Sequence, residues 1–156
     1  MLTAKNYTPV RDHQAIPTGE IAPVAGTPMD FTTPKRIGQD IDADFQQLKF
    51  TGGYDHNYVT DNYAKGSNRL IATAYSDKSK IAMDVTSDCP CVQFYAANFV
   101  DNEKGKGGHI YNKREAFCLE TQVEPNAVNT ENFHSPVLEA GEQYDSNTSY
   151  RFYIKD

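Results

Sequence analysis

The sequence predicts an all-β protein built as an antiparallel β-sandwich. Short runs in which apolar and polar residues alternate with a period of two recur along the chain, and turn-forming residues separate them. The chain contains 10 Tyr and 8 Phe but no Trp, and aromatic residues of this kind are enriched in strands. No internal repeat and no linker interrupts the pattern, so residues 1–156 are expected to form one unit.

Composition and charge limit the classes of partner. The chain has 156 residues, enough for one domain with a substantial core, and 38% of them are hydrophobic. The 21 acidic residues outnumber the 15 basic ones, giving a net charge of −6 with no basic run. This balance argues against nucleic acid and anionic membranes as partners. No apolar run approaches the roughly 20 residues that span a bilayer, and residues 1–5 lack the layout of a signal peptide, so we expect a cytoplasmic protein.

The cysteines indicate neither a disulfide framework nor a metal site. There are 3 of them, an odd number. Cys89 and Cys91 flank a single proline, which is tighter than the usual spacing of paired zinc ligands, and no second ligand pair follows. We therefore expect two reduced cysteines at a turn, and no metal.

Little regular secondary structure is predicted for the first third of the chain. Residues 1–38 are rich in proline and glycine, which predicts a fixed loop or edge-strand segment without a long helix. The stretch 40–48 (DIDADFQQL) is the one plausible helical segment in the first half. Asp40 or Asp42 would cap its amino terminus.

A strand with polar residues on one face is predicted over 52–59 (GGYDHNYV). The paired glycines indicate crowded backbone at its start, and the alternation places Asp55 and Asn57 on the face opposite His56. An Asp and an Asn two residues apart, beside aromatic rings, are suited to binding sugar hydroxyls. A turn aspartate with a structural asparagine is an equally open interpretation.

A hairpin and a further strand follow. Residues 69–75 and 80–86 are separated by a four-residue turn and predict a β-hairpin whose core face carries Ile81, Met83 and Val85.

The next strand is predicted over 92–100, with Gln93 and Phe99 on the face opposite Val92. The glycine-rich stretch 101–109 is expected to be a flexible surface loop. It does not fit a phosphate-binding pattern, because no helix pattern follows it.

The stretch 116–123 (AFCLETQV) predicts a strand that carries a carboxylate at its centre. Cys118, Glu120 and Gln122 share one face, opposite Leu119. Glutamate is depleted in strands, and its charge is costly if it is buried without a partner. Glu120 is therefore either a solvated outer-face residue or a carboxylate directed into a site. The remaining predicted elements are a polar loop over 124–136 and a closing strand over 149–154.

Four parts of the sequence, in order, resemble the carboxyl-terminal half of the aldose 1-epimerase, or galactose mutarotase, family. They are PTGEIAPVAGTPMDF (17–31), GGYDHNYV (52–59), PCVQFYAANF (90–99) with AFCLETQ (116–122), and PVLEAGEQY (136–144). The resemblance covers nearly the whole chain. It implies an antiparallel β-sandwich of the galactose mutarotase type, of which this chain would form about half.

The resemblance also implies an activity. The family interconverts the α and β anomers of free aldoses, such as galactose or glucose, without a cofactor. A carboxylate takes the proton of the anomeric hydroxyl while an imidazole protonates the ring oxygen, so that the ring opens and recloses on the other face. By this resemblance Glu120 is expected to be the catalytic base, and Asp55 and Gln93 are expected to bind the sugar.

The same resemblance implies missing parts. The family's general-acid histidine, a second sugar-binding histidine and an arginine lie upstream of the region that this chain matches. The chain's own histidines are interpreted as structural or solvent-facing; they are His13, His56, His109 and His134. Because half a sandwich exposes strand edges and sheet faces, we expect this chain to pair with a copy of itself or with a separate amino-terminal half.

Three functions are open from the sequence. The first is a mutarotase subunit that acts on a monosaccharide and takes its acid from a partner chain. The second is a non-catalytic carbohydrate-binding or regulatory module that keeps part of the sugar pocket. The third is a purely structural remnant in which the sandwich matters and the pocket is relaxed. The alternative to the expected pairing is that residues 1–156 are a truncated product that folds poorly alone.

Overall fold

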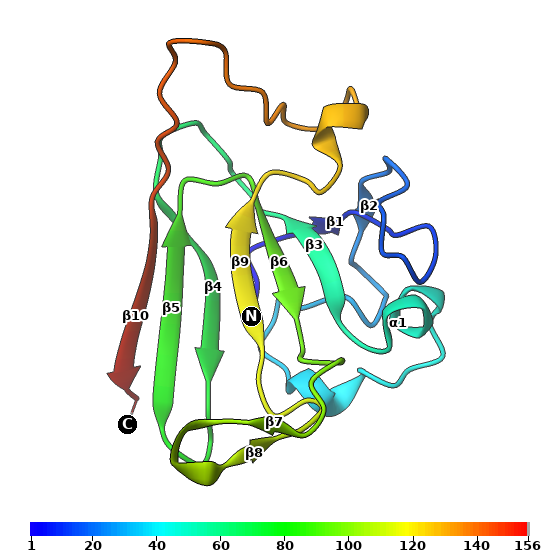
Figure 1. Cartoon of the computed structure of the whole chain (residues 1–156), viewed down its shortest axis with the longest axis vertical. Coiled ribbons are helices and arrows are strands. Elements are labelled where there is room, and N and C mark those ends of the chain that lie inside the picture. Colours follow the sequence, from blue (N-terminus) through cyan, green and yellow to red (C-terminus); the bar gives the residue numbers. More distant parts are fainter. Residues whose placement is uncertain (156) are drawn as a thin grey trace.

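Two antiparallel sheets carry the fold in the computed structural model, which describes residues 1–155 (Figure 1). The larger sheet has five strands, in the order β2 (Ala22–Pro23), β1 (Asn6–Tyr7), β3 (Asp55–Val59), β6 (Cys91–Tyr95) and β9 (Cys118–Gln122). The smaller sheet has three, in the order β10 (Thr148–Ile154), β5 (Ile81–Ser87) and β4 (Arg69–Tyr75). The prediction of an antiparallel all-β fold is confirmed.

One hydrophobic core lies between the two sheets. Phe94 of β6 and Leu119 of β9 point inward from the larger sheet, and Ile71 and Val85 come from the smaller one. Period-two alternation produces this arrangement, because it places every second side chain of each strand on the same face. The faces that point away from the core are then free to carry polar side chains.

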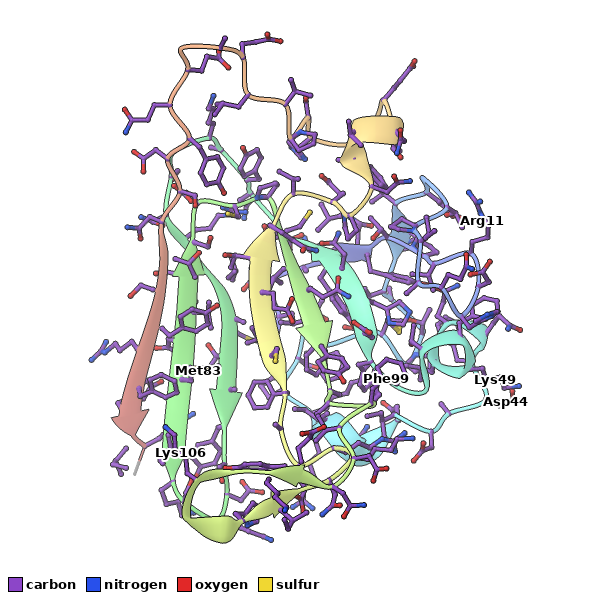
Figure 2. The ribbon with its side chains drawn as sticks, viewed as in Figure 1. Arg11, Asp44, Lys49, Met83, Phe99 and Lys106 are labelled. Atoms are coloured by element: carbon purple, nitrogen blue, oxygen red, sulfur yellow. The ribbon has the colours of Figure 1, made fainter. Side chains whose placement is uncertain are left out.

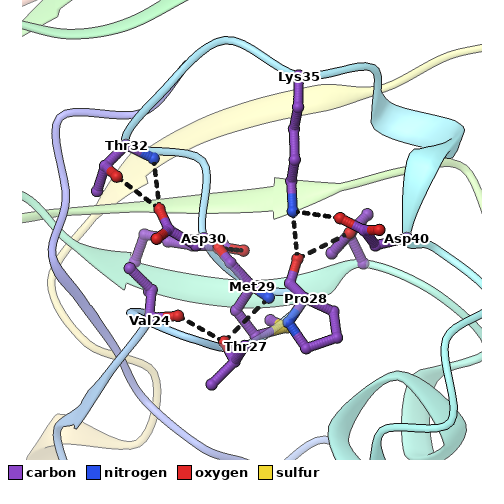
Figure 3. Close-up of polar contacts among 10 residues, drawn as sticks. Val24, Thr27, Pro28, Met29, Asp30, Thr32, Lys35 and Asp40 are labelled. Atoms are coloured by element: carbon purple, nitrogen blue, oxygen red, sulfur yellow. Dashed lines mark hydrogen bonds and ion pairs between the residues drawn. The ribbon is translucent and has the colours of Figure 1, made fainter.

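The proline-rich amino-terminal segment is fixed against the larger sheet by hydrogen bonds. Lys35 Nζ donates to the carbonyl oxygen of Pro28 at 2.7 Å and pairs with the Asp40 carboxylate at 2.8 Å (Figure 3). The buried hydroxyl of Tyr58 on β3 donates to the carbonyl oxygen of Met29 at 3.1 Å. This segment contributes only the short strands β1 and β2 and the 3₁₀ turn η1 (Ile37–Gln39), as its prolines predict.

The helix predicted over 40–48 is wrong in position. The helix α1 covers Gln46–Thr51, and its N-cap residue, Phe45, makes no capping bond. The carboxylates of the two predicted caps have other partners, since Asp40 pairs with Lys35 and Asp42 forms a bidentate ion pair with Arg114 at 2.8 Å. Within residues 1–155, no helix has both the length and the apolar character needed to cross a membrane.

The paired glycines before β3 behave as predicted. Gly52 ends α1 in the left-handed region, with φ 66°. Gly53 has φ 137°, and a Cβ atom built on it would lie 2.3 Å from Oδ1 of Asn98. Asn98 is held there because its Nδ2 donates to the carbonyl oxygen of Tyr54 at 2.9 Å. Crowded backbone therefore does require glycine at the start of this strand.

The strand predicted over 92–100 is shorter than expected. β6 ends at Tyr95, and Ala97 has φ 50°, a left-handed conformation that cannot continue a strand. Phe99 lies beyond the end of β6 and is 70% exposed (Figure 2). The prediction that Phe99 extends the face of Gln93 is therefore wrong.

The predicted hairpin over 69–75 and 80–86 is confirmed as β4 and β5. Of its predicted core residues, Val85 is fully buried and Met83 packs against the core (Figure 2). Ile81, by contrast, is 44% exposed. The closing strand is confirmed as β10, which pairs with β5 along its whole length. Opposite Ile81 and Met83 lie Ile154 and Phe152, each 65% exposed. We refer to Ile81, Phe152 and Ile154 as the uncovered face, because the inner side of this sheet loses its cover toward that end.

The stretch 101–109 is more regular than a loop. β7 (Glu103–Lys104) and β8 (Ile110–Tyr111) pair in a small antiparallel hairpin that encloses the 3₁₀ turn η2 (Lys106–Gly108). Gly105 permits this turn, because a Cβ atom there would overlap the ring of Tyr111. The hairpin is a surface feature at the same end of the molecule as the uncovered face (Figure 1).

Candidate functional site

Strand register brings three polar side chains into one row across the outer face of the larger sheet. Asn57 of β3 lies opposite Gln93 of β6, and Gln93 lies opposite Glu120 of β9. Directly opposed residues on neighbouring strands share a face, so the row Asn57–Gln93–Glu120 runs perpendicular to the strands. Asp55, two residues before Asn57, belongs to the same face.

The side-chain amides of this face form a hydrogen-bonded network. Gln93 Nε2 donates to Oδ1 of Asp55 at 2.8 Å. Gln122 Nε2 donates to Oδ1 of Asn57 at 3.0 Å and lies 3.4 Å from Oε1 of Gln93. These bonds fix which way each amide points, so the polar groups are oriented before any ligand arrives.

A cavity of about 200 Å³ lies over this face. The strand face supplies part of the lining, and the amino-terminal segment and Pro125, which follows β9, supply the rest. The lining residues are Thr8, Val10, Ala15, Pro17, Asp55, Asn57, Gln93, Glu120, Gln122 and Pro125. The three predicted site residues, Asp55, Gln93 and Glu120, therefore meet at one cavity.

The two carboxylates of the cavity have different environments. Asp55 is half-buried, and this burial raises its pKa, while the hydrogen bond from Gln93 acts in the opposite direction. Glu120 is exposed, and its carboxylate has no hydrogen bond or ion pair with any of residues 1–155. The Asp55 carboxylate is thus held by Gln93, whereas the Glu120 carboxylate is unpaired within this range.

Cys118 stands next to the carboxylates on the same face. Burial raises the pKa of its thiol, and the nearby charges of Glu120 and Asp55 raise it further. The thiol is therefore protonated at neutral pH and is not an activated nucleophile.

None of the histidines within residues 1–155 lines the cavity. His56 lies on the core side of β3, opposite to Asp55, as strand parity predicts; it is fully buried, and burial lowers its pKa to about 4. Its Nδ1 accepts a hydrogen bond from the backbone N–H of Asp55 at 3.2 Å. His56 is thus a neutral core residue. His134 pairs with Glu124, and His13 and His109 are exposed.

Two further polar residues line the cavity: Asn57, which the sequence suggests for binding sugar hydroxyls beside Asp55, and Gln122, which alternation along β9 places on the face of Glu120. The lining residues Ala15 and Pro17 have no such signal, because they lie in the amino-terminal segment outside the named strands, where the backbone path depends on tertiary contacts. Oγ1 of Thr8 and Nδ2 of Asn57 are buried and have no hydrogen-bond partner among residues 1–155. The same residues contain no group of three or more His, Cys, Asp or Glu arranged to hold a metal ion.

Comparison with known proteins places the chain in a family. The family model described as Aldose 1-epimerase matches residues 1–151. The chain belongs to the aldose 1-epimerase family. It is 40% identical to the human protein named galactose mutarotase over 156 residues, and 33% identical to the aldose 1-epimerase of Escherichia coli strain K12 over 154 residues.

Solved structures of aldose 1-epimerase relatives share the fold. An aldose epimerase homologue from C. elegans superposes with a TM-score of 0.79 at 27% identity, covering 99% of this chain and 45% of that one. A galactose 1-epimerase from Lactobacillus acidophilus gives a TM-score of 0.71 at 24% identity, a likeness of fold. The predicted sandwich of the galactose mutarotase type is confirmed.

This family member spans less than half the length of its relatives. The match to the human protein covers 98% of this chain but 43% of the relative, and the match to the E. coli protein also covers 43% of the relative. The expectation that the sequence corresponds to only part of the family's domain is confirmed.

Proposed function

We propose that this chain supplies the base and the sugar-binding wall of an aldose 1-epimerase site. The substrate would be a free hexose such as galactose or glucose. The observation that carries the proposal is the row Asn57–Gln93–Glu120 with Asp55 beside it, all facing one polar cavity. Membership of the family supports it. The cavity, at about 200 Å³, is smaller than the roughly 300–1,000 Å³ of pockets for drug-sized ligands and suits a monosaccharide.

In the proposed reaction each cavity group has one task. The unpaired carboxylate of Glu120 takes the proton of the anomeric hydroxyl, while an acid gives a proton to the ring oxygen and the bond between that oxygen and the anomeric carbon breaks. The aldehyde rotates about the adjacent carbon–carbon bond, and the hydroxyl attacks its other face as both protons return. Asp55 and Gln93, already bonded to each other, would hold the sugar hydroxyls. No cofactor takes part.

The acid would come from outside this cavity. Its lining contains no histidine, lysine or arginine among the residues described, and His56 is neutral and faces the core. We propose that a second chain supplies the acid, either a copy of this chain or a polypeptide corresponding to the rest of the family domain. The uncovered face of β5 and β10 supports this, because a soluble sandwich normally covers such side chains. We expect this assembly in the cytoplasm.

A second candidate is a non-catalytic carbohydrate-binding or regulatory module. The cavity without an acid favours it, since Asp55, Gln93 and Asn57 could hold a sugar without turning it over. The unpaired Glu120 favours the enzyme, because a sugar-binding wall does not need a free carboxylate there.

Polarimetry of freshly dissolved α-glucose or α-galactose tests the proposal. The chain is compared with Glu120→Gln and with Glu103→Gln, an exposed glutamate of the β7–β8 hairpin, each alone and mixed with a polypeptide covering the remaining part of the family domain. Loss of acceleration in the first variant, with retention in the second, supports Glu120 as the base.

Binding separates the remaining outcomes. If no mixture exceeds the rate in buffer but titration calorimetry detects sugar binding, the module is the better description. A chain that neither binds sugar nor accelerates mutarotation would be a structural remnant.

A further inference from the structure

A second glutamate near the cavity is buried, and the cavity reaction does not use it. Glu124 lies two residues after β9, and its side chain is only 1% exposed. Both of its carboxylate oxygens are 3.0 Å from Nδ1 of His134, and the backbone N–H of His134 donates to one of them at 3.1 Å. A buried carboxylate is strongly disfavoured unless it is paired in this way, so the two residues depend on each other.

This pair closes a loop. Residues 124 and 134 form the two ends of a segment, here called the 124–134 loop, that contains the 3₁₀ turn η3 (Ala127–Asn129). With both the ring and the backbone of His134 bonded to one carboxylate, the ends are held in register. The loop is therefore a closed unit that leaves directly from the strand carrying Glu120.

The 124–134 loop forms part of the cavity wall. Pro125, next to Glu124, lines the cavity together with Ala15 and Pro17 from the amino-terminal segment. Farther along the loop, Nδ2 of Asn132 donates to the carbonyl oxygen of Gly19 at 2.9 Å. The loop thus joins the end of β9 to the amino-terminal segment that also lines the cavity.

His134 is itself supported from the smaller sheet. The ring of Tyr63 meets the His134 ring edge-on, with centroids 4.9 Å apart, and the guanidinium group of Arg69 stands 5.3 Å from the centroid of Tyr63. Arg69, on β4, donates to the carbonyl oxygens of Ser87 and Cys89. The contacts run without a break from the smaller sheet to the cavity loop.

We infer that Glu124 and His134 are positioning residues for sugar binding: their paired side chains hold the 124–134 loop, and with it Pro125, at the width that a sugar ring requires. Neither residue touches the reacting atoms. The inference rests on the proposed function, since it needs the cavity to take a sugar.

The test measures the sugar affinity and the thermal stability of the same variants. Dissociation constants for glucose and galactose are obtained by NMR titration of the full chain, beside its melting temperature. His134→Ala removes the imidazole and leaves the buried carboxylate with only the backbone N–H of residue 134, and we expect it to weaken sugar binding roughly tenfold. Glu124→Gln combined with His134→Gln removes the charge and keeps two groups that can bond, so it should recover most of the affinity.

Asp42→Asn provides the matched control. It breaks the bidentate pair with Arg114, whose residues do not line this cavity. It should lower the melting temperature and leave the sugar affinity unchanged. If His134→Ala and Asp42→Asn lose stability equally and both keep wild-type sugar affinity, the positioning role is overturned, while the proposed function stands. A wild-type chain that binds no sugar, either alone or mixed with a polypeptide covering the rest of the family domain, would overturn the proposed function and this inference with it.

Discussion

The half-buried Asp55 carboxylate destabilises the folded chain when it is ionised, and this effect can be measured as a pH dependence of stability. Burial raises its pKa in the folded chain above the ordinary value of 3.8, so the native state binds this proton more tightly than the unfolded state does. The loss of unfolding free energy caused by the ionised carboxylate is therefore absent below about pH 3.8 and develops as the pH rises through the native pKa.

Asp55→Asn should remove that loss while keeping an oxygen that accepts from Gln93. We expect a higher melting temperature than wild type at pH 7, and no difference below about pH 3.8. Thermal unfolding from pH 3 to pH 8 checks this expectation. Asp145→Asn, at an exposed position, is the control and should give no gain at pH 7. A variant less stable than wild type at pH 7 would show that the ionised carboxylate stabilises the fold.

Thr8 allows a second test at the level of a single atom. Its buried Oγ1 has no hydrogen-bond partner among residues 1–155. Thr8→Val keeps the shape and removes the unpaired hydroxyl, which should raise the free energy of unfolding by about 1 kcal/mol. The Oγ1 of Thr60, by contrast, donates to the carbonyl oxygen of Pro90 at 2.6 Å, so Thr60→Val should lower it by about 1–2 kcal/mol. Urea denaturation measures both; a loss of stability in Thr8→Val would mean that its hydroxyl is paired in solution.

The turn between α1 and β3 depends on two adjacent glycines with different constraints. Gly53→Ala must place a Cβ against Asn98 at φ 137°, and we expect it to cost about 2–3 kcal/mol. Gly52→Ala meets nothing within 4 Å, at φ 66°, and should cost only about 1 kcal/mol. Chemical denaturation of both variants gives the difference. Equal losses would show that the left-handed backbone alone, without the contact to Asn98, sets the requirement for glycine.

The strands could be predicted from the sequence, because their alternation of polar and apolar residues is a local pattern. The polar face of the site could be predicted for the same reason. Alternation alone places Asp55 opposite His56 and groups Glu120 with Gln122, as the structure shows. Where the prediction failed, contacts with residues far away in the sequence determine the structure. Asp42 fails as a helix cap because Arg114, 72 residues away, binds it. The part of the cavity lining formed by Ala15 and Pro17 depends on tertiary contacts that have no periodic signature in the sequence.

The uncovered face predicts that the chain associates with itself. Phe152 and Ile154 are each 65% exposed beside Ile81, on the inner side of a sheet whose other end is buried. Such a patch favours association through its apolar area. Sedimentation velocity should show the chain as a dimer or larger species at micromolar concentration. Phe152→Ser combined with Ile154→Thr should shift it toward monomer, while Arg151→Ser, on the opposite face of β10, should not. A wild-type chain that stays monomeric would contradict this expectation.

The position of β9 has a consequence for kinetics. It is the last strand of its sheet, paired on one side with β6 and touched on the other side by β10 through single contacts, such as that from the Tyr150 hydroxyl to the carbonyl oxygen of Leu119. On the proposed function, a second chain bound at the uncovered face would contact β10 and, through these contacts, reach the strand that carries Glu120. Turnover per molecule would then depend on the concentration of the protein. It would fall on dilution and recover when the partner chain is added.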